Sequence, residues 1–318
     1  NEFWEKSSYQ GWWDGYIGPG KALDTDKYFV ICCNYLGGCY GSTGPASINP
    51  ETGKQYGRGF PYPTVSDIVD SQIKVLDHLG IYKLMAVIGG SVGGLAAKDL
   101  AVRYPDRVHA VIPIASGLRA TVLAKALNFE QIFAIAEDKD FHGGDYYEHG
   151  VTPWRGLALA RMISHKTFIS LNVLEKRASD VIIQHDDVLS GYLLEHTVES
   201  YLLHQGKKFI NRFDANSYLR ITNAWQSFDL PHAVGDGDPV KTLSVCKGQE
   251  WYVFSINSDG CFFPREQDEI EQCLKLNKVP VQHVTVHSEK GHDAFLVEPD
   301  LFIPHIYFAL RKAGDFVR

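Results

Sequence analysis

The stretch LMAVIGGSVGG, residues 84–94, decides the fold of this chain. Residues 84–88 form a short apolar run, which is typical of a strand buried on both faces of a parallel sheet. The run leads directly into GGSVGG and then into residues 92–104, which have the spacing of a helix and are followed by Pro105. Strand, tight turn and helix in this order predict a nucleophile elbow, a turn that projects the Ser91 hydroxyl into an active site.

The pattern Gly-x-Ser-x-Gly alone is weak evidence, because it also occurs in ordinary glycine-rich turns. A phosphate-binding loop is another glycine-rich alternative, but the turn matches neither GxxxxGK[ST] nor GxGxxG. The strand before Ser91 and the helix after it favour the elbow.

Strands and helices alternate on both sides of this turn. Such alternation is typical of a parallel sheet with right-handed crossovers, an α/β fold. Residues 118–247 instead have the pattern of helical segments, and we predict an inserted helical cap there. The predicted division is a first part of the α/β core in residues 1–117, the cap in residues 118–247 and the second part of the core in residues 248–318. We predict strands at residues 28–33, 84–88, 108–115, 252–256 and 281–286, and helices at residues 65–79, 92–104, 265–276 and 305–311.

Ser91 needs a general base and a carboxylate that orients the base, since a serine hydroxyl is a poor nucleophile at neutral pH. In folds with this elbow the chain order is serine, then aspartate or glutamate, then histidine. Asp259 follows the strand predicted at 252–256, and His292 follows the strand predicted at 281–286. Taken singly, Asp259 also fits a turn former and His292 an exposed loop histidine. Their shared position at the carboxyl ends of strands favours a catalytic triad.

The composition restricts the class of protein. With 318 residues, 45% of them hydrophobic and 22% charged, the chain is long enough to bury a large core. A net charge of -7 and a pI near 6.0 argue against nucleic acid or an anionic membrane as a partner. The 6 cysteines have neither disulfide-framework nor metal-binding spacing, so we expect a reducing, cytoplasmic location. We expect no bound metal or cofactor, and interpret His142, Asp145 and His149 as a solvated loop.

Several long motifs extend this interpretation. Together they resemble the homoserine O-acetyltransferase family over nearly the whole chain. The resemblance implies an α/β-hydrolase fold, acetyl-CoA as co-substrate, L-homoserine as the acceptor in methionine synthesis, and a homodimer formed through the helical cap. The motifs are residues 11–32 (GWWDGYIGPGKALDTDKYFVIC), residues 34–57 (NYLGGCYGSTGPASINPETGKQYG), GGSVGG, residues 212–219 (RFDANSYL) and residues 289–298 (EKGHDAFLVE).

The resemblance also implies roles for single residues. Ser91 would carry the acetyl group, and the backbone N–H of Val92 would be one oxyanion-hole donor. Asp293, directly after the triad histidine, would bind the substrate amine. Arg212, with Tyr218 nearby, would bind the substrate carboxylate, which an arginine can hold with two hydrogen bonds. From spacing alone, Asp293 also fits a turn former, Arg212 a solvated cap residue and Tyr218 a core aromatic.

The sequence departs from the family before the GWWD motif. Family members have further strands there and a loop that supplies the second oxyanion-hole donor, and this sequence has no match to them. We expect a rate loss on the order of 10²- to 10³-fold without that donor. We also expect a gap one strand wide, about 4.8 Å, between residues 28–33 and residues 84–88. We therefore hypothesise that the N-terminal strands belong to a separate N-terminal fragment, which completes the sheet, or were lost.

Acetyl transfer to homoserine is the leading interpretation among three. A serine hydrolase would use the same triad with water as the acceptor, and a catalytically inactive binding module would account for the unmatched loop. The presence of Arg212, Tyr218 and Asp293 favours the transferase, since a simple esterase has no use for an amino-acid clamp. The sequence leaves open an acetyl or succinyl donor, and homoserine, serine or another hydroxyl acceptor.

Overall fold

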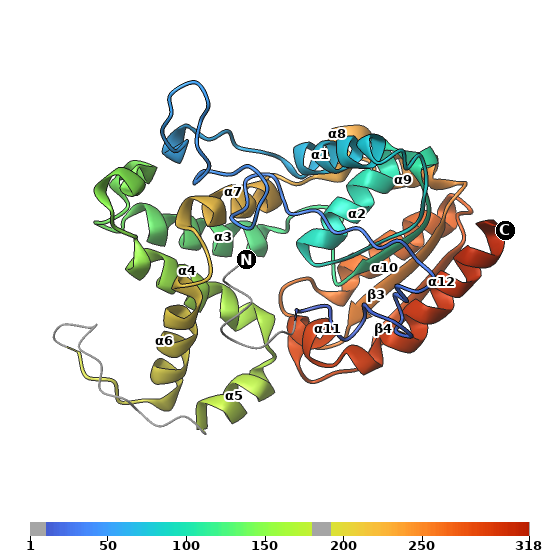
Figure 1. The fold of residues 1–318 in the computed structure, drawn as a ribbon. Coiled ribbons are helices and arrows are strands. Elements are labelled where there is room, and N and C mark those ends of the chain that lie inside the picture. Colours follow the sequence, from blue (N-terminus) through green and yellow to red (C-terminus); the bar gives the residue numbers. More distant parts are fainter. Residues whose placement is uncertain (1–10, 180–191, 318) are drawn as a thin grey trace.

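A four-stranded parallel sheet forms the centre of one part of the protein, in the order β1-β2-β3-β4, and the helical region of α3 to α7 lies to its side (Figure 1). The computed structural model describes residues 11–179 and 192–317. The strands are β1 (Leu84–Gly90), β2 (Val108–Ile114), β3 (Glu250–Ile256) and β4 (Val281–Val286). The α-helices are α1 (Val65–His78), α2 (Val92–Arg103), α3 (Val122–Ala136), α4 (Trp154–Phe168), α5 (Leu171–Ser179), α6 (Thr197–Ile210), α7 (Ala215–Gln226), α8 (Leu230–Val234), α9 (Pro239–Leu243), α10 (Pro264–Leu276), α11 (Ala294–Val297) and α12 (Ile303–Val317).

Local sequence signals set the ends of these elements. Thr64 caps α1 through a reciprocal capping box, in which the Asp67 N–H donates to the Thr64 hydroxyl over 3.1 Å. Gly80 follows the helix with a φ of +70°, which glycine adopts without the steric cost of a Cβ atom. Four of the five predicted strands are confirmed, all except the one at residues 28–33. The four predicted helices are confirmed as well, with shifted ends and a longer last helix.

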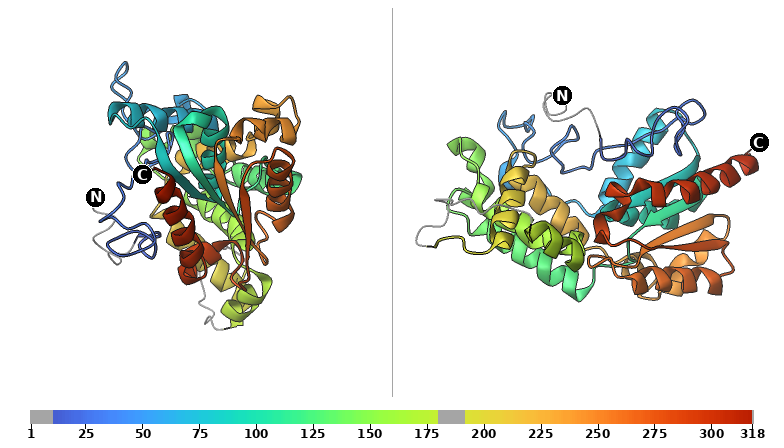
Figure 2. Two further views of the ribbon diagram at one scale, coloured as in Figure 1. Left: turned by 90° about the vertical axis from the view of Figure 1, so that its right-hand side faces the viewer. Right: turned by 90° about the horizontal axis from the view of Figure 1, so that it is seen from below.

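Helices cover both faces of the sheet (Figure 2). On one face, α1, α2 and α10 pack around a core that includes Leu95, Trp251 and Ile270. On the other face, α12 and N-terminal residues pack around Tyr16 and Phe302. Every residue of β2 is buried between these two cores, as expected for an interior strand of a parallel sheet.

Helices α3 to α7 form a second region, which packs around Ile135, Leu157 and Leu219 (Figures 1 and 2). Helix α4 brings this region against the 3-10 helix η6 (Gly291–Asp293), which follows β4. In contrast, α8 and α9 pack on the core, where Leu230 and Leu243 lie in the same cluster as Ile270. The predicted domain boundaries after residues 117 and 247 stay predictions.

The strand predicted at residues 28–33 is wrong. These residues have no regular secondary structure, and Phe29 is 78% exposed. A strand needs a hydrogen-bonded neighbour, and among the described residues β1 pairs only with β2. The apolar run therefore indicates a preference for burial that this segment does not satisfy.

A groove separates residues 28–33 from β1. Its volume is about 420 Å³, and its walls include both segments together with Leu76 of α1 and Leu100 of α2. The gap expected between these two segments is present in the structure. One long side of β1 consequently lies at the edge of the sheet.

Three further features concern location and cofactors. No helix in the described part of the chain is both long enough and apolar enough to cross a bilayer. All of the cysteines are free thiols. Within residues 11–179 and 192–317, no three His, Cys, Asp or Glu side chains form a group that could hold a metal ion.

Candidate active site

Ser91 occupies the predicted elbow between β1 and α2. Its backbone has φ 56° and ψ -124°, a conformation that non-glycine residues rarely adopt and that is concentrated at functional sites. The turn is tight, because a Cβ atom at Gly89 would lie 2.1 Å from the carbonyl oxygen of Gly93. The Ser91 N–H donates to the Ile114 carbonyl of β2 over 2.9 Å, which fixes the turn to the sheet. Helix α2 begins at Val92, so its first N–H groups, which lack partners inside the helix, lie at this turn.

Asp259 and His292 form a buried hydrogen-bonded pair. His292 Nδ1 lies 2.7 Å from Asp259 Oδ2, and the two residues are 3% and 4% exposed. The other carboxylate oxygen of Asp259 accepts from the N–H groups of Cys261, over 2.7 Å, and Phe262, over 2.9 Å. These bonds hold the carboxylate in the orientation that positions an imidazole as a base.

Opposing effects act on the pKa of His292. Burial lowers it, but the carboxylates of Asp259, Asp293 and Glu266 raise it, and the net direction is upward. Glu266 is itself buried, which raises its pKa to about 7. The imidazolium form of His292 is therefore stabilised, as a general base that must take up a proton requires.

Aromatic rings connect the serine turn with the histidine. Phe295 packs edge-on against His292, with ring centroids 5.6 Å apart, and a Cβ atom at Gly90 would lie 2.6 Å from the Phe295 ring. Phe168 and Phe262 complete the surroundings of His292, at 6.0 Å and 5.6 Å. Within the described residues, no hydrogen bond joins the Ser91 hydroxyl to the His292 ring; such bonds are often long before substrate binds.

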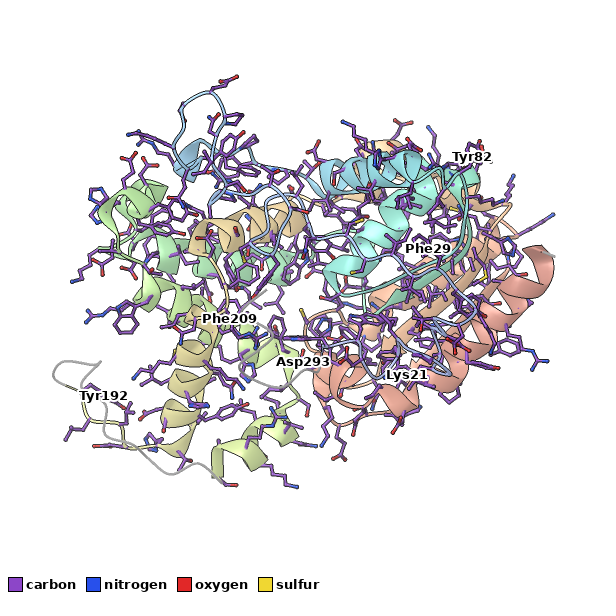
Figure 3. All side chains as sticks on the ribbon, in the orientation of Figure 1. Lys21, Phe29, Tyr82, Tyr192, Phe209 and Asp293 are labelled. Carbon is purple, nitrogen blue, oxygen red and sulfur yellow. The ribbon has the colours of Figure 1, made fainter. Side chains whose placement is uncertain are left out.

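The positive charge of Arg161, in helix α4 of the second region, acts on Asp293. Burial raises the pKa of the Asp293 carboxyl, and Arg161 is among the charges that oppose this rise. Arg161 stacks over Phe168 and Phe209, 5.1 Å and 5.0 Å from the ring centroids. In Figure 3, Asp293 lies where the core meets the cap, near Phe209 of α6.

Tyr218 belongs to the same group of side chains as Arg161. Burial raises the pKa of the Tyr218 hydroxyl, and the positive charge of Arg161 opposes the rise. The Tyr218 hydroxyl donates to the side-chain oxygen of Gln131 in α3. The charges of Tyr218 and Asp293 both favour the charged form of Arg161 and oppose the effect of burial, which lowers its pKa.

Arg212 lies between helices α6 and α7. Its guanidinium stacks over Trp12, 5.4 Å from the ring centroid, and its backbone carbonyl accepts from the Tyr40 hydroxyl. Its charge acts on Arg161, whose pKa burial lowers and Arg212 lowers further. The charges of Asp293, Tyr218 and Arg212 thus all act on Arg161.

Arg161 was missed in the sequence analysis. The available signal was an arginine inside the apolar run GLALARMIS of a helix, where a long cation needs a reason to be buried. Periodicity alone gave no way to tell which face of that helix meets the core.

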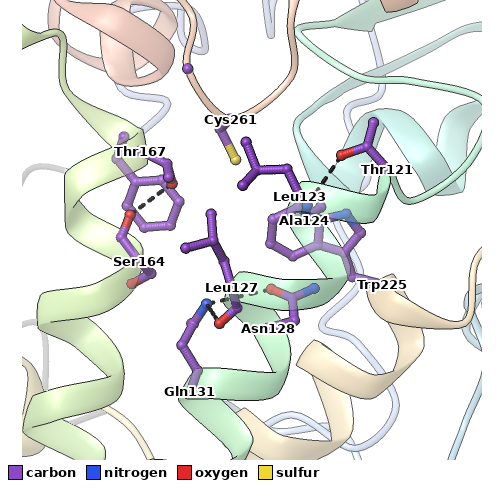
Figure 4. A pocket seen from close by; sticks show the side chains of 12 residues that line it. Thr121, Leu123, Ala124, Leu127, Asn128, Gln131, Ser164, Thr167, Trp225 and Cys261 are labelled. Atoms are coloured by element: carbon purple, nitrogen blue, oxygen red, sulfur yellow. Dashed lines mark hydrogen bonds between the residues drawn. The ribbon is translucent and has the colours of Figure 1, made fainter.

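A small pocket lies between the cap and the Asp259 loop (Figure 4). Its lining includes Gln131 of α3, Ser164 and Phe168 of α4, Trp225 of α7 and Cys261. Phe168 is shared with the His292 surroundings, so the pocket adjoins the pair of Asp259 and His292. Leu127 and Gln131 point into it from α3 in Figure 4.

Comparisons with known proteins identify the family of this chain. Residues 7–299 match the family model described as alpha/beta hydrolase fold. The chain is 44% identical over 307 residues, 96% of this chain and 78% of the relative, to a homoserine O-acetyltransferase of Rhodospirillum rubrum. It is also 44% identical over 295 residues, 92% of this chain and 76% of the relative, to a homoserine O-succinyltransferase of Alkalilimnicola ehrlichii.

Solved structures show the same architecture. A homoserine O-acetyltransferase from Bacillus anthracis superposes with a TM-score of 0.85 at 28% identity, over 96% of this chain and 82% of that chain. The esterase E22 superposes with a TM-score of 0.86 at 28% identity, over 96% and 84%. The chain therefore belongs to the alpha/beta hydrolase fold family and, within it, to the homoserine O-acyltransferases.

Proposed function

We propose that this protein transfers an acyl group from acyl-CoA to the hydroxyl of L-homoserine, with acetyl-CoA as the donor and Ser91 as the covalent carrier. The observation that carries the proposal is the buried pair of Asp259 and His292, 2.7 Å apart, beside the serine elbow. Its position next to Asp293 and Arg161 adds one anion and one cation, the two charges that recognise an amino acid.

In the first step, Ser91 Oγ attacks the thioester carbonyl carbon while His292 takes up the hydroxyl proton. The carbonyl π electrons move onto its oxygen, and the backbone N–H of Val92 at the start of α2 stabilises that negative charge. The C–S bond then breaks, the thiolate of CoA leaves with the proton from His292, and an ester remains on Ser91.

In the second step, the hydroxyl of homoserine enters the position vacated by CoA. His292 takes its proton, the oxygen attacks the ester carbonyl, and the bond to Ser91 Oγ breaks. His292 returns the proton to Ser91, so the enzyme is restored and O-acylhomoserine leaves. Asp259 orients the imidazole in both steps and stabilises its positive charge.

Asp293 binds the ammonium group of homoserine, and Arg212 with Tyr218 binds its carboxylate. Arg161 strengthens this second contact, because its positive charge acts on Tyr218 as well as on Asp293. Phe168 and Phe262 shield the ester on Ser91 from water, which would otherwise hydrolyse it.

A succinyl donor is the second candidate. Relatives at 44% identity carry both donor names, and a second arginine beside Arg212 offers a partner for the additional carboxylate of a succinyl group. Hydrolysis is the third, since the esterase E22 superposes as closely as the Bacillus anthracis transferase.

We also propose a homodimer formed through the cap. Helix α3 exposes Val122 by 85%, Phe129 by 60% and Phe133 by 55%, an apolar face that a second copy would cover. Light scattering of the wild type and of a Phe129→Asp variant tests this, because the variant should be monomeric.

The test of the function is the intact mass of the protein after brief exposure to acetyl-CoA or succinyl-CoA, with and without L-homoserine. An adduct that forms on wild type, is absent from Ser91→Ala and disappears when homoserine is added supports transfer. Adduct turnover without homoserine favours a hydrolase, and the donor that labels faster identifies the acyl group. A chain that forms no adduct with either donor contradicts the proposal.

A further inference from the structure

Lys98 is completely buried, at 0% exposure, in α2, the helix that follows Ser91. Its side-chain nitrogen donates to the carbonyl of Gly94 over 2.8 Å and to the hydroxyl of Ser116 over 2.6 Å. An apolar side chain would fill the same position without the cost of removing a charged group from water. Packing alone therefore does not explain a lysine here, and the proposed steps of acyl transfer do not use it.

The Lys98 side chain holds the first turn of α2. The Gly94 N–H donates to the Ser91 carbonyl over 2.9 Å, so the residue that receives Lys98 is itself bonded to Ser91. Ser116 lies against the same turn, because a Cβ atom at Gly94 would lie 2.6 Å from the Ser116 Cβ atom. Lys98 thereby ties the elbow to the segment that follows β2.

Ser116 continues the contact to α10. The side chain of Gln267 is 1% exposed, and with its oxygen toward Ser116 it accepts from the Ser116 N–H over 3.1 Å and donates to the Phe263 carbonyl over 3.2 Å. The Phe263 N–H donates in turn to the Glu266 carboxylate over 3.0 Å. The segment after β2 also passes close to this carboxylate, since a Cβ atom at Gly117 would lie 2.2 Å from Glu266 Oε2.

Phe263 is the last residue before α10 and belongs to the loop that holds Asp259. The Asp259 carboxylate accepts from the N–H of Phe262, the residue directly before Phe263, over 2.9 Å. A connected series of buried groups thus runs from the Ser91 turn to the carboxylate that is bonded to His292. Satisfied polar networks in a protein interior make the elements that they connect rigid.

We propose that Lys98 is a positioning residue for acyl transfer, which holds the Ser91 turn at a fixed distance from the Asp259 loop. The inference rests on the proposed function, in which Ser91 Oγ must come within reach of the His292 imidazole that Asp259 orients. Lys98 acts through its neighbours rather than on the substrate. A displacement of about 1 Å at such a site can cost about 100-fold in rate.

The first test replaces Lys98 with methionine, which has a similar length and no hydrogen-bond donor. Lys74→Met, at an exposed position of α1, which packs on α2, is the matched control. Labelling of Ser91 by a fluorophosphonate reagent reports the reactivity of the serine without acyl-CoA, and steady-state kinetics report transfer. We expect Lys98→Met to lower the labelling rate and kcat by about 10- to 100-fold, with KM for L-homoserine within about twofold of wild type.

The free energy of unfolding separates positioning from a structural role. Burial lowers the pKa of Lys98, and the charge of Glu266 opposes this effect. Burial also raises the pKa of Glu266 to about 7, so below that pH the carboxyl of Lys98→Met takes up a proton rather than remain an unpaired charge. We therefore expect denaturant unfolding at about pH 6 to give Lys98→Met the wild-type midpoint or a higher one.

Ser116→Ala tests the next contact and is the smaller change should Lys98→Met not fold. We expect it to lower the same two rates, and the double variant to be no slower than Lys98→Met, since both substitutions break one series of contacts.

Three results overturn the proposal. The first is labelling at the wild-type rate in Lys98→Met or Ser116→Ala. The second is a loss of rate that appears only together with a matching loss of stability, and the third is additive losses in the double variant. A wild-type chain whose Ser91 is labelled but which transfers no acyl group would contradict the proposed function alone, because the labelling rates still measure the effect of Lys98.

Discussion

The outer strands β1 and β4 each lead to one of the side chains in the proposed chemistry. β1 ends directly before Ser91, and β4 precedes His292. β4 has the alternating sequence of a strand that belongs at an edge, whereas β1 has the uniformly apolar sequence of an interior strand. His292 therefore follows an edge strand with polar residues, whereas Ser91 follows an edge strand that is apolar throughout.

This difference teaches that the geometry of the Ser91 turn does not depend on a second neighbour of β1 among the described residues. The Ser91 turn is held from the inner side, by the hydrogen bond from its N–H to Ile114 of β2. The tight contact between Gly89 and Gly93 lies inside the turn itself. The open edge should therefore affect the stability of β1 more than the conformation of the elbow.

The largest expected effect comes from the side chains that the two strands deliver. We predict that Ser91→Ala and His292→Ala each lower kcat by about 10⁶-fold, and that the double variant is no slower than either. Groups that act as one unit have this non-additivity. Single-turnover rates of acyl-CoA consumption measure it, with Ser42→Ala, a partly exposed loop serine, as the control. Additive losses would mean that β1 and β4 supply separate functions.

The next effect tests the orientation of the histidine delivered by β4. We predict that Asp259→Asn lowers kcat by about 10⁴-fold while leaving the fold intact, because the amide no longer holds the required tautomer of His292. Asp268→Asn on the exposed face of α10 is the control. Steady-state kinetics and circular dichroism provide the measurement. A loss below 10-fold would show that His292 is oriented by other groups.

Part of the candidate site could be predicted from the sequence. The turn at Ser91 and the positions of Asp259 and His292 after their strands could be predicted because local signals and chain order determine them: a glycine-rich turn after an apolar strand, and two residues that each follow a strand. The structure brings Asp259 and His292 together as expected. Their catalytic roles stay predictions until the kinetics are measured.

Two features were not readable, for different physical reasons. Arg161 reaches the site from a cap helix, and its position depends on how α4 packs against η6, which no local pattern encodes. Residues 28–33 have the sequence of a buried strand but not the structure of one. Apolar patterning predicts the environment that a segment favours, and pairing depends on a neighbour elsewhere in the chain or outside it.

A smaller effect is expected from Arg161 of α4, which acts on Asp293 beyond the end of β4. We predict that Arg161→Met raises KM for homoserine and lowers kcat/KM by about 10- to 100-fold, as expected when one charge-assisted hydrogen bond to a carboxylate is lost. Arg155→Met, an arginine of the same helix that stacks on Trp154, is the matched control. A loss confined to succinyl-CoA would instead assign Arg161 to the donor.

The pH dependence tests the electrostatics at the β4 end. His292 must be neutral to act as a base, and its pKa is raised above 6.5, so kcat/KM should rise with pH through a midpoint above 6.5. Asp259→Asn should lower that midpoint, because it removes a negative charge that raises the pKa of His292 against the effect of burial. Glu266→Gln is the comparison, since burial raises the pKa of the Glu266 carboxyl to about 7 and its charge acts on His292. A midpoint that follows Glu266 rather than Asp259 would contradict the assignment.

The smallest effect separates the two edges directly. Val87 of β1 and Val284 of β4 are both partly buried, so replacing either with alanine should cost about 1 kcal/mol in the free energy of unfolding. Val87 packs against the cluster that contains Leu95 and Trp251, and Val284 packs against the cluster that contains Tyr16 and Phe302. Denaturant unfolding of both variants compares the two costs. A cost several-fold larger at one position would mean that the two edge strands contribute unequally to stability.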